Sequence, residues 1–172
     1  MISIFRNKLK KKEGGFTLVE TLFYISIFVV LFLVVINAMI LMLRSFKQTM
    51  VNRDLLQGGV AMERMSREIK NGVNITTATT GDLDFFVNDE NNPGNTITYH
   101  FLLVGTKILA KSNNIDIGDV TSPNISVTAL NFTQINTVNS KAVKISLTVQ
   151  SNRFGSTRTE TFYDTVVLRG SY

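Results

Sequence analysis

The sequence contains no cysteine, no tryptophan and only one histidine. Without cysteine there is no disulfide, no thiol nucleophile and no zinc site built on cysteine, so an apolar core and hydrogen bonds between strands must hold the fold. The single histidine, His100, has no serine or aspartate motif beside it, which predicts neither a catalytic triad nor a metal trio. We therefore expect a structural or surface role for His100, and we expect that the protein is not an enzyme.

Other signatures of ligand binding are also missing. No glycine-rich phosphate loop follows an expected strand, and no stripe of basic and aromatic residues predicts nucleic acid as a partner. Several acidic residues fall in or near expected turns, but they lack the spacing of a twelve-residue calcium loop, and Asp-rich turns are ordinary in β domains. We expect no cofactor and no metal. These acidic residues are Asp82, Asp84, Asp89, Glu90, Asp116 and Asp119.

The most prominent feature that is present is an uncharged run from Leu22 to Leu43. As a helix it is about 33 Å long, enough to cross a hydrocarbon core of roughly 30 Å. Basic residues ahead of a first span keep that end in the cytoplasm, so residues from Phe46 onward should lie outside. We expect a single-pass protein of the cytoplasmic membrane, surrounded at first by lipid. The basic residues are Arg6, Lys8, Lys10, Lys11 and Lys12.

The net charge of +5 is concentrated in this leading segment. Residues 1–15 hold five basic side chains and one acid, Glu13, which amounts to +4. The rest of the chain has 13 basic and 12 acidic side chains, or +1. A positive net charge would ordinarily suggest nucleic acid as a partner. Here the excess of basic residues is mainly a signal for the orientation of the chain in the membrane.

One carboxylate, Glu20, lies at the leading edge of the apolar stretch, where insertion costs roughly 2.5–3.5 kcal/mol. The motif that contains it is Gly14-Gly15-Phe16-Thr17-Leu18-Val19-Glu20. Followed by the long apolar run, this motif resembles the processing site of type IV prepilins and type II secretion pseudopilins. The resemblance implies that a prepilin peptidase cuts after Gly15 and methylates the new N-terminus at Phe16. It also implies that Glu20 is kept, and that it helps to dock subunits by pairing with the α-amino group of Phe16.

The same resemblance implies an organisation and a set of partners. Residues 1–15 would be a cleaved leader, and residues 16–43 would span the membrane before entering the core of an extracytoplasmic filament. The partners would be other pilin or pseudopilin subunits and an inner-membrane assembly platform, in a type IV pilus, type II secretion or competence machine. A secretory signal peptide is disfavoured because the run exceeds the usual ~7–15-residue core and no small-x-small cleavage site follows it. A signal-anchored binding module unrelated to filaments stays open as the alternative.

Helical periodicity continues past the membrane through residues 44–72, which predicts an amphipathic half of the same helix. Asn71-Gly72 predicts its end. The pair Gly58-Gly59 interrupts the pattern and predicts either a bend or a place where a strand crosses closely. The predicted apolar stripe consists of Phe46, Met50, Val51, Leu55, Met62, Met65 and Ile69.

Residues 73–172 change to period-two alternation, as in Val143, Ile145, Leu147 and Val149, which predicts antiparallel strands with one buried face. Gly105-Thr106 between two such runs predicts a hairpin turn. The fold class expected is α+β, a long N-terminal helix packed on a C-terminal antiparallel sheet domain, as in the pilin fold. The strands expected are Leu83–Val87, Thr96–Val104, Lys107–Lys111, Asn124–Gln134, Lys141–Gln150 and Arg158–Leu168.

Four short segments extend the resemblance to minor pilins and pseudopilins of the J/W class. One lies at the end of the predicted helix and reads Met-Glu-Arg-Met-Ser-Arg-Glu-Ile-Lys, residues 62–70. The others are Ile97–Phe101, Val127–Phe132 and Val166–Arg169. This resemblance implies a minor subunit of such a filament.

Overall fold

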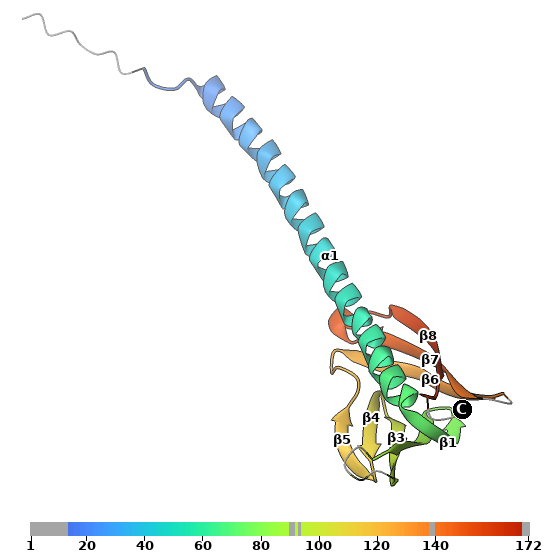
Figure 1. Ribbon diagram of the computed structural model, residues 1–172. Coiled ribbons are helices and arrows are strands. Elements are labelled where there is room, and N and C mark those ends of the chain that lie inside the picture. The colour runs from blue at the N-terminus through green and yellow to red at the C-terminus, as the bar shows by residue number, and fades with distance from the viewer. Residues whose placement is uncertain (1–13, 90–91, 93, 138–139, 170–172) are drawn as a thin grey trace, which may run out of the picture. The chain divides into compact units, whose positions relative to one another are not determined.

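A computed structural model describes residues 14–89, 92, 94–137 and 140–169 (Figure 1). In these residues a helix, α1 (Leu18–Lys70), precedes all of the strands. The chain divides into two compact units between Ser45 and Phe46. The strands are β1 (Gly72–Thr79), β2 (Asp82–Asn88), β3 (Thr96–Val104), β4 (Lys107–Ser112), β5 (Ile115–Asp119), β6 (Ile125–Asn136), β7 (Lys141–Ser151) and β8 (Thr159–Val167), with a short 3-10 turn, η1 (Arg153–Gly155), before β8.

The described part of the first unit consists of residues 14–45 and contains the N-terminal part of α1. By length and composition this helix is apolar enough to cross a membrane. Every residue from Gly14 to Ser45 is exposed, so this part of the helix contributes no residue to a buried core.

The described residues of the second unit form two antiparallel sheets (Figure 1). One sheet has the order β1-β2-β3-β4-β5 and the other the order β6-β7-β8, and an isolated bridge between Thr80 and Asn131 connects them. In both sheets neighbouring strands are consecutive in the chain, as expected where short turns connect antiparallel strands. The α+β class, a long apolar N-terminal helix packed on antiparallel sheets, is confirmed.

A single apolar core joins the C-terminal part of α1 to both sheets. Met65 comes from the helix, Phe85 and Phe101 from the five-stranded sheet, and Leu147 from the three-stranded sheet, and all four are 0 or 1% exposed. The ring of Phe85 lies 5.8 Å from that of Phe101 and 5.7 Å from that of Tyr99. The predicted alternation in β7 is confirmed, because its apolar positions 143, 145, 147 and 149 are all fully buried.

The predicted helical stripe is confirmed only from Val51 onward. Val51, Leu55, Met62, Met65 and Ile69 are buried. Phe46 and Met50, the first two residues of the stripe, are 52% and 42% exposed, because the helix enters the packed core only at Val51. Asp54, Gly58 and Ala61 are buried in addition.

Three glycine predictions can be compared with the structure. The helix ends at Lys70, as Asn71-Gly72 predicted, and a Cβ on Gly72 would lie 2.9 Å from the carbonyl oxygen of Ile69. The Gly58-Gly59 pair marks a close crossing, since a Cβ on Gly58 would lie 2.6 Å from the Phe162 ring of β8. The hairpin at Gly105-Thr106 is confirmed by the Val104–Lys107 pair and by a φ of 62° at Gly105, a left-handed value that suits glycine.

Two strands were missing from the sequence prediction, which began at Leu83. In β1, register shifts between Gly72 and Asn74 and between Ile75 and Thr77 disrupt period-two alternation. In β5, Ile115 and Ile117 are exposed, and Gly118 follows a register irregularity opposite β4. In both strands the alternating apolar pattern is short: it covers only Ile115 to Ile117 in β5 and only Val73 to Ile75 in β1.

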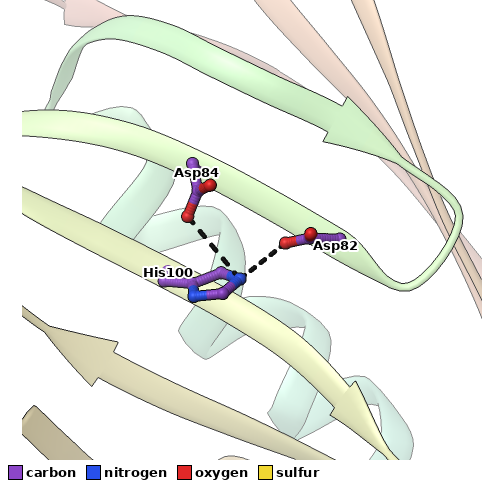
Figure 2. Close-up of side chains that lie close together, drawn as sticks. All are labelled: Asp82, Asp84 and His100. Atoms are coloured by element: carbon purple, nitrogen blue, oxygen red, sulfur yellow. Dashed lines mark hydrogen bonds and ion pairs between the residues drawn. The ribbon is translucent and has the colours of Figure 1, made fainter. Parts of the chain in front are cut away.

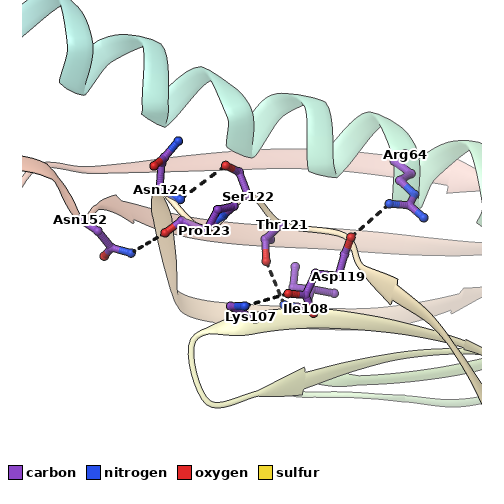
Figure 3. A network of polar contacts seen from close by, with 9 residues as sticks. All are labelled: Arg64, Lys107, Ile108, Asp119, Thr121, Ser122, Pro123, Asn124 and Asn152. Carbon is purple, nitrogen blue, oxygen red and sulfur yellow. Dashed lines mark hydrogen bonds and ion pairs between the residues drawn. The ribbon is translucent and has the colours of Figure 1, made fainter.

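The connection from β5 to β6 passes from one sheet to the other and is held by hydrogen bonds on both sides (Figure 3). The Ile108 N–H of β4 donates to the buried Thr121 hydroxyl at 3.2 Å. The side chain of Asn152, just after β7, donates to the Pro123 carbonyl at 3.3 Å. Arg64 of α1 donates to the last carbonyl of β5 at 3.2 Å. These bonds fix the crossing between the sheets.

Candidate functional site

The residues around the predicted cleavage site, Gly14 to Thr17, lie in an exposed segment ahead of α1. Residues 14–17 have no regular secondary structure, and the side chain of Phe16 is 75% exposed. A Cβ added to Gly14 or Gly15 would meet nothing within 4 Å. Exposed, non-helical backbone of this kind is what a peptidase needs in order to reach a peptide bond.

The first turn of α1 is capped by the side chain of Thr17. The Glu20 N–H donates to the Thr17 hydroxyl at 3.2 Å, and the Thr21 hydroxyl donates to the Thr17 carbonyl at 2.9 Å. Threonine is a favourable N-cap because its oxygen accepts a hydrogen bond from an N–H that has no partner within the helix. Glu20 therefore lies in the first turn, where the positive end of the helix dipole stabilises its carboxylate.

Tyr24 contacts both Phe16, just before α1, and Glu20, in its first turn. Its hydroxyl donates to Glu20 Oε1 at 3.5 Å, and its ring meets that of Phe16 edge-on, with 6.2 Å between centroids. Side chains four residues apart lie on the same helix face, which explains the contact with Glu20. The sequence interpretation had not paired Tyr24 with Glu20, although the spacing of four residues could have indicated the contact.

A second cluster of chemically capable side chains lies on the five-stranded sheet (Figure 2). His100 Nε2 on β3 lies 2.6 Å from Asp82 Oδ1 and 3.6 Å from Asp84 Oδ1 on β2. The potential ligand atoms of these three residues all lie within 4.8 Å of one another. The sequence interpretation did not anticipate that Asp82 and Asp84 lie beside His100. Asp82 and Asp84 lie within β2, where the strand register places them beside His100.

The remaining acidic residues named from the sequence do not join this cluster. Asp116 Oδ1 lies 3.2 Å from Lys111 Nζ, and Asp119 Oδ2 lies 2.8 Å from Lys107 Nζ. Asp89 accepts a hydrogen bond from the Asn92 side chain at 3.0 Å. Glu90 lies outside the described residues, as do the basic residues of the leader.

The comparisons with known proteins identify the N-terminal part of the chain. Residues 10–36 match the family model described as the prokaryotic N-terminal methylation motif. Comparison with the curated proteins and with the solved structures gave no match. The match covers the exposed segment, the Thr17 cap, Glu20, Tyr24 and much of the apolar helix. It supports a prepilin-like protein that is processed by prepilin peptidase and has a membrane-capable N-terminal helix.

Proposed function

We propose that the protein is a minor pilin or pseudopilin, a structural subunit that enters a type IV pilus-like or type II secretion filament through α1. The observation that supports this proposal is that the family match and two structural features fall on the same residues. The methylation motif, residues 10–36, spans the accessible segment 14–17 and much of the exposed apolar helix that follows it. An apolar helix with no cover inside its own chain needs lipid or other helices around it, and a subunit that moves from bilayer to filament uses both in turn.

In the proposed maturation, prepilin peptidase cleaves after Gly15 and the new N-terminus at Phe16 is methylated. The leader, residues 1–15, stays on the cytoplasmic side because of its basic residues. The second unit then lies outside the membrane, and the assembly platform draws the processed subunit into the filament.

Glu20 is the proposed docking residue. Cleavage creates a positive α-amino group at Phe16, and a carboxylate in an apolar environment is stabilised by an opposite charge nearby. In the proposed filament the amine of an incoming subunit meets Glu20 of its neighbour. The Tyr24 hydroxyl, 3.5 Å from Glu20 Oε1, orients the carboxylate for this contact.

The J/W assignment within the proposal rests on the four short segments that resemble that class. In this chain they fall on the end of α1, on β3, on β6, and on β8 with the residues after it. The proposed role of the second unit is to form lateral contacts with other subunits, as a minor component that initiates or ends a filament.

Processing can be tested without disturbing the fold, because neither glycine of the motif is packed against anything. Gly15→Val should block cleavage when the chain is produced with prepilin peptidase, whereas the control Gly14→Ala should be cleaved normally. Intact-mass and N-terminal sequence analysis should show a mature protein that begins at methylated Phe16. A mature protein that retains Met1 would contradict the proposal and favour a signal-anchored binding module.

Docking is tested by Glu20→Gln, which removes the charge but keeps the size of the side chain. The variant should be cleaved and methylated but should be lost from isolated filaments. Tyr24→Phe is the matched control, since it removes the hydroxyl contact and keeps the carboxylate, and we expect it to be incorporated with reduced efficiency. Normal incorporation of the Glu20→Gln variant would refute the docking role while leaving the processing step intact.

A further inference from the structure

We propose that Asp82, Asp84 and His100 form a binding site for a first-row divalent metal ion of the zinc type. The site lies on the face of the five-stranded sheet that points away from the core (Figure 2). It is separate from the processing segment and does not depend on the function proposed above.

The register of two neighbouring strands brings the three donors together. Asp82 and Asp84 alternate with Leu83 along β2, so both carboxylates share one face while Leu83 is buried on the other. On β3, His100 is the direct partner of Asp84 and lies next to the buried Phe101. One imidazole and two carboxylates therefore point to the same side of the sheet.

The spacing of the donor atoms suits a small ion. In a tetrahedral zinc site with bonds of roughly 2.0–2.1 Å, ligand atoms lie about 3.3 Å apart. The distances from His100 Nε2 are 2.6 Å to Asp82 and 3.6 Å to Asp84, on either side of that value. Small side-chain rotations would equalise them. The side chains are 21 to 36% exposed, so an ion can enter and a fourth position remains open towards solvent.

The sheet beneath the cluster holds these positions firmly. The β2–β3 pairing runs without a register shift from Asp82–Leu102 to Asn88–Thr96, whereas the β1–β2 and β4–β5 pairings contain irregularities. The strands are anchored by Leu83 and Phe101, which are 0% and 1% exposed. Donors on rigid strands keep their geometry better than donors on loops.

The charges of the cluster favour a divalent cation. Two carboxylates within 4.8 Å of each other repel, and an ion of charge +2 compensates both. Lys111, which is paired with His100 on the β4 side, directs its ammonium group to Asp116 at 3.2 Å. The neighbouring lysine is thus bound to a carboxylate outside the cluster.

The types of donor select the class of metal. Calcium takes six to eight oxygen ligands, and an imidazole nitrogen is a poor substitute for one of them. Imidazole with carboxylate oxygens suits zinc and other first-row divalent ions. Because the sequence has no cysteine and no second histidine, His100 is its one imidazole donor, which makes the assignment directly testable.

The experiment uses the full chain without an affinity tag, solubilised in detergent and freed of metal with a chelator. Titration calorimetry with zinc chloride should give one ion per chain, with micromolar or tighter affinity. In a parallel titration followed by NMR, zinc chloride should shift the resonances of the His100 imidazole. His100→Gln and Asp84→Asn should each weaken binding at least tenfold. The control Asp116→Asn, which removes a carboxylate from β5 of the same sheet, should bind as the unaltered chain does.

Three results would overturn the proposal. One is no heat of binding with zinc chloride. Another is zinc binding that leaves the imidazole resonances unchanged or survives His100→Gln, which would indicate adventitious carboxylate contacts. The last is tighter binding of calcium than of zinc. Circular dichroism of each variant shows whether it is folded, and the imidazole shift provides a readout that needs no substitution.

Discussion

The ring of Phe162 on β8 lies where a side chain on Gly58 of α1 would need to be. A Cβ at Gly58 would approach the ring to 2.6 Å and a Val149 methyl group to 2.8 Å, whereas a Cβ at Gly59 would lie 3.4 Å from its nearest neighbour, in ordinary contact. Two adjacent glycines in one helix thus have different physical roles. Only Gly58 is needed for the close approach of the sheet.

The glycine pair gives the first prediction. Gly58→Ala should lower the free energy of unfolding by up to about 2 kcal/mol, because an overpacking cost of roughly 1–3 kcal/mol is offset by a gain in helix propensity of only about 1 kcal/mol. Gly59→Ala should raise it by about 0.5–1 kcal/mol, since the propensity gain is not opposed. Denaturant unfolding of the full chain in detergent measures both. Equal effects of the two substitutions would show that the close crossing does not limit packing.

A second prediction concerns the buried carboxylate of Asp54, whose side chain is 3% exposed. Its Oδ2 lies 2.7 Å from Arg153 Nε and accepts a hydrogen bond from Ser151 at 3.3 Å. Arg153→Met should cost roughly 2 kcal/mol of stability, less than a fully buried pair because the Arg153 side chain is 41% exposed. The control is Arg158→Met, which removes an exposed contact to Asn52 and should cost well under 1 kcal/mol.

The double variant Asp54→Asn with Arg153→Met completes this test. If the cost of Arg153→Met comes from an uncompensated buried charge, the double variant should be more stable than Arg153→Met alone. Additive losses from the two substitutions would contradict an ion pair between α1 and the turn before β8.

A third prediction concerns alkaline pH. Burial raises the pKa of Tyr99 above its ordinary value of 10.0, the nearby Glu68 carboxylate raises it further, and Arg64 partly opposes the increase. The folded chain therefore holds this proton more tightly than the unfolded chain. The contribution of protonated Tyr99 to the free energy of unfolding is fully present below about pH 10. It is lost as the pH rises from there through the pKa of Tyr99 in the folded chain.

Two measurements check the tyrosine prediction. The tyrosinate absorbance of the full chain minus that of Tyr99→Phe should titrate above pH 10, and Glu68→Gln should move this titration downward. Unfolding midpoints compared at about pH 8 and pH 10.5 should fall less in Tyr99→Phe than in the unaltered chain. A Tyr99 titration at or below its ordinary value would contradict the burial argument.

A fourth prediction concerns the exposed apolar helix. Phe32→Lys, near the middle of the uncharged run, should weaken membrane insertion by about 2.5–3.5 kcal/mol. Phe46→Lys is the matched control beyond the run and should insert as the unaltered chain does. A glycosylation-based insertion assay measures both. Equal insertion of the two variants would refute the assignment of residues 22–43 as the membrane segment.

The sequence predicted well those features that depend on neighbours along the chain. The end of α1 at Lys70 follows from Asn71-Gly72, and the strands with strict alternation, such as β3 and β7, were located closely. The confirmed hairpin at Gly105 depends on a local backbone requirement. These features depend on residues that are close together in the sequence, so they can be recognised without knowledge of the fold.

Features that depend on distant parts of the chain were missed. In the sequence, Asp54 resembles a solvent-facing charge between apolar residues. In the structure it is buried against Arg153 and Ser151, which lie about a hundred residues further along the chain. The Asp-x-Asp pattern at 82–84 is visible in the sequence, but its convergence with His100 requires the register between β2 and β3. The strand β1 was missed because its two register shifts remove the alternating pattern.

The sequential order of both sheets has a consequence for how the chain reaches its native state. Each strand from β2 to β5, and again β7 and β8, pairs with the strand that immediately precedes it in the chain. Short loops between such partners cost little entropy to close, so pairing can advance from the N-terminal side as the polypeptide emerges. A chain with this strand order shields most strand edges soon after they appear, and among the described residues no late strand has to insert between strands already formed.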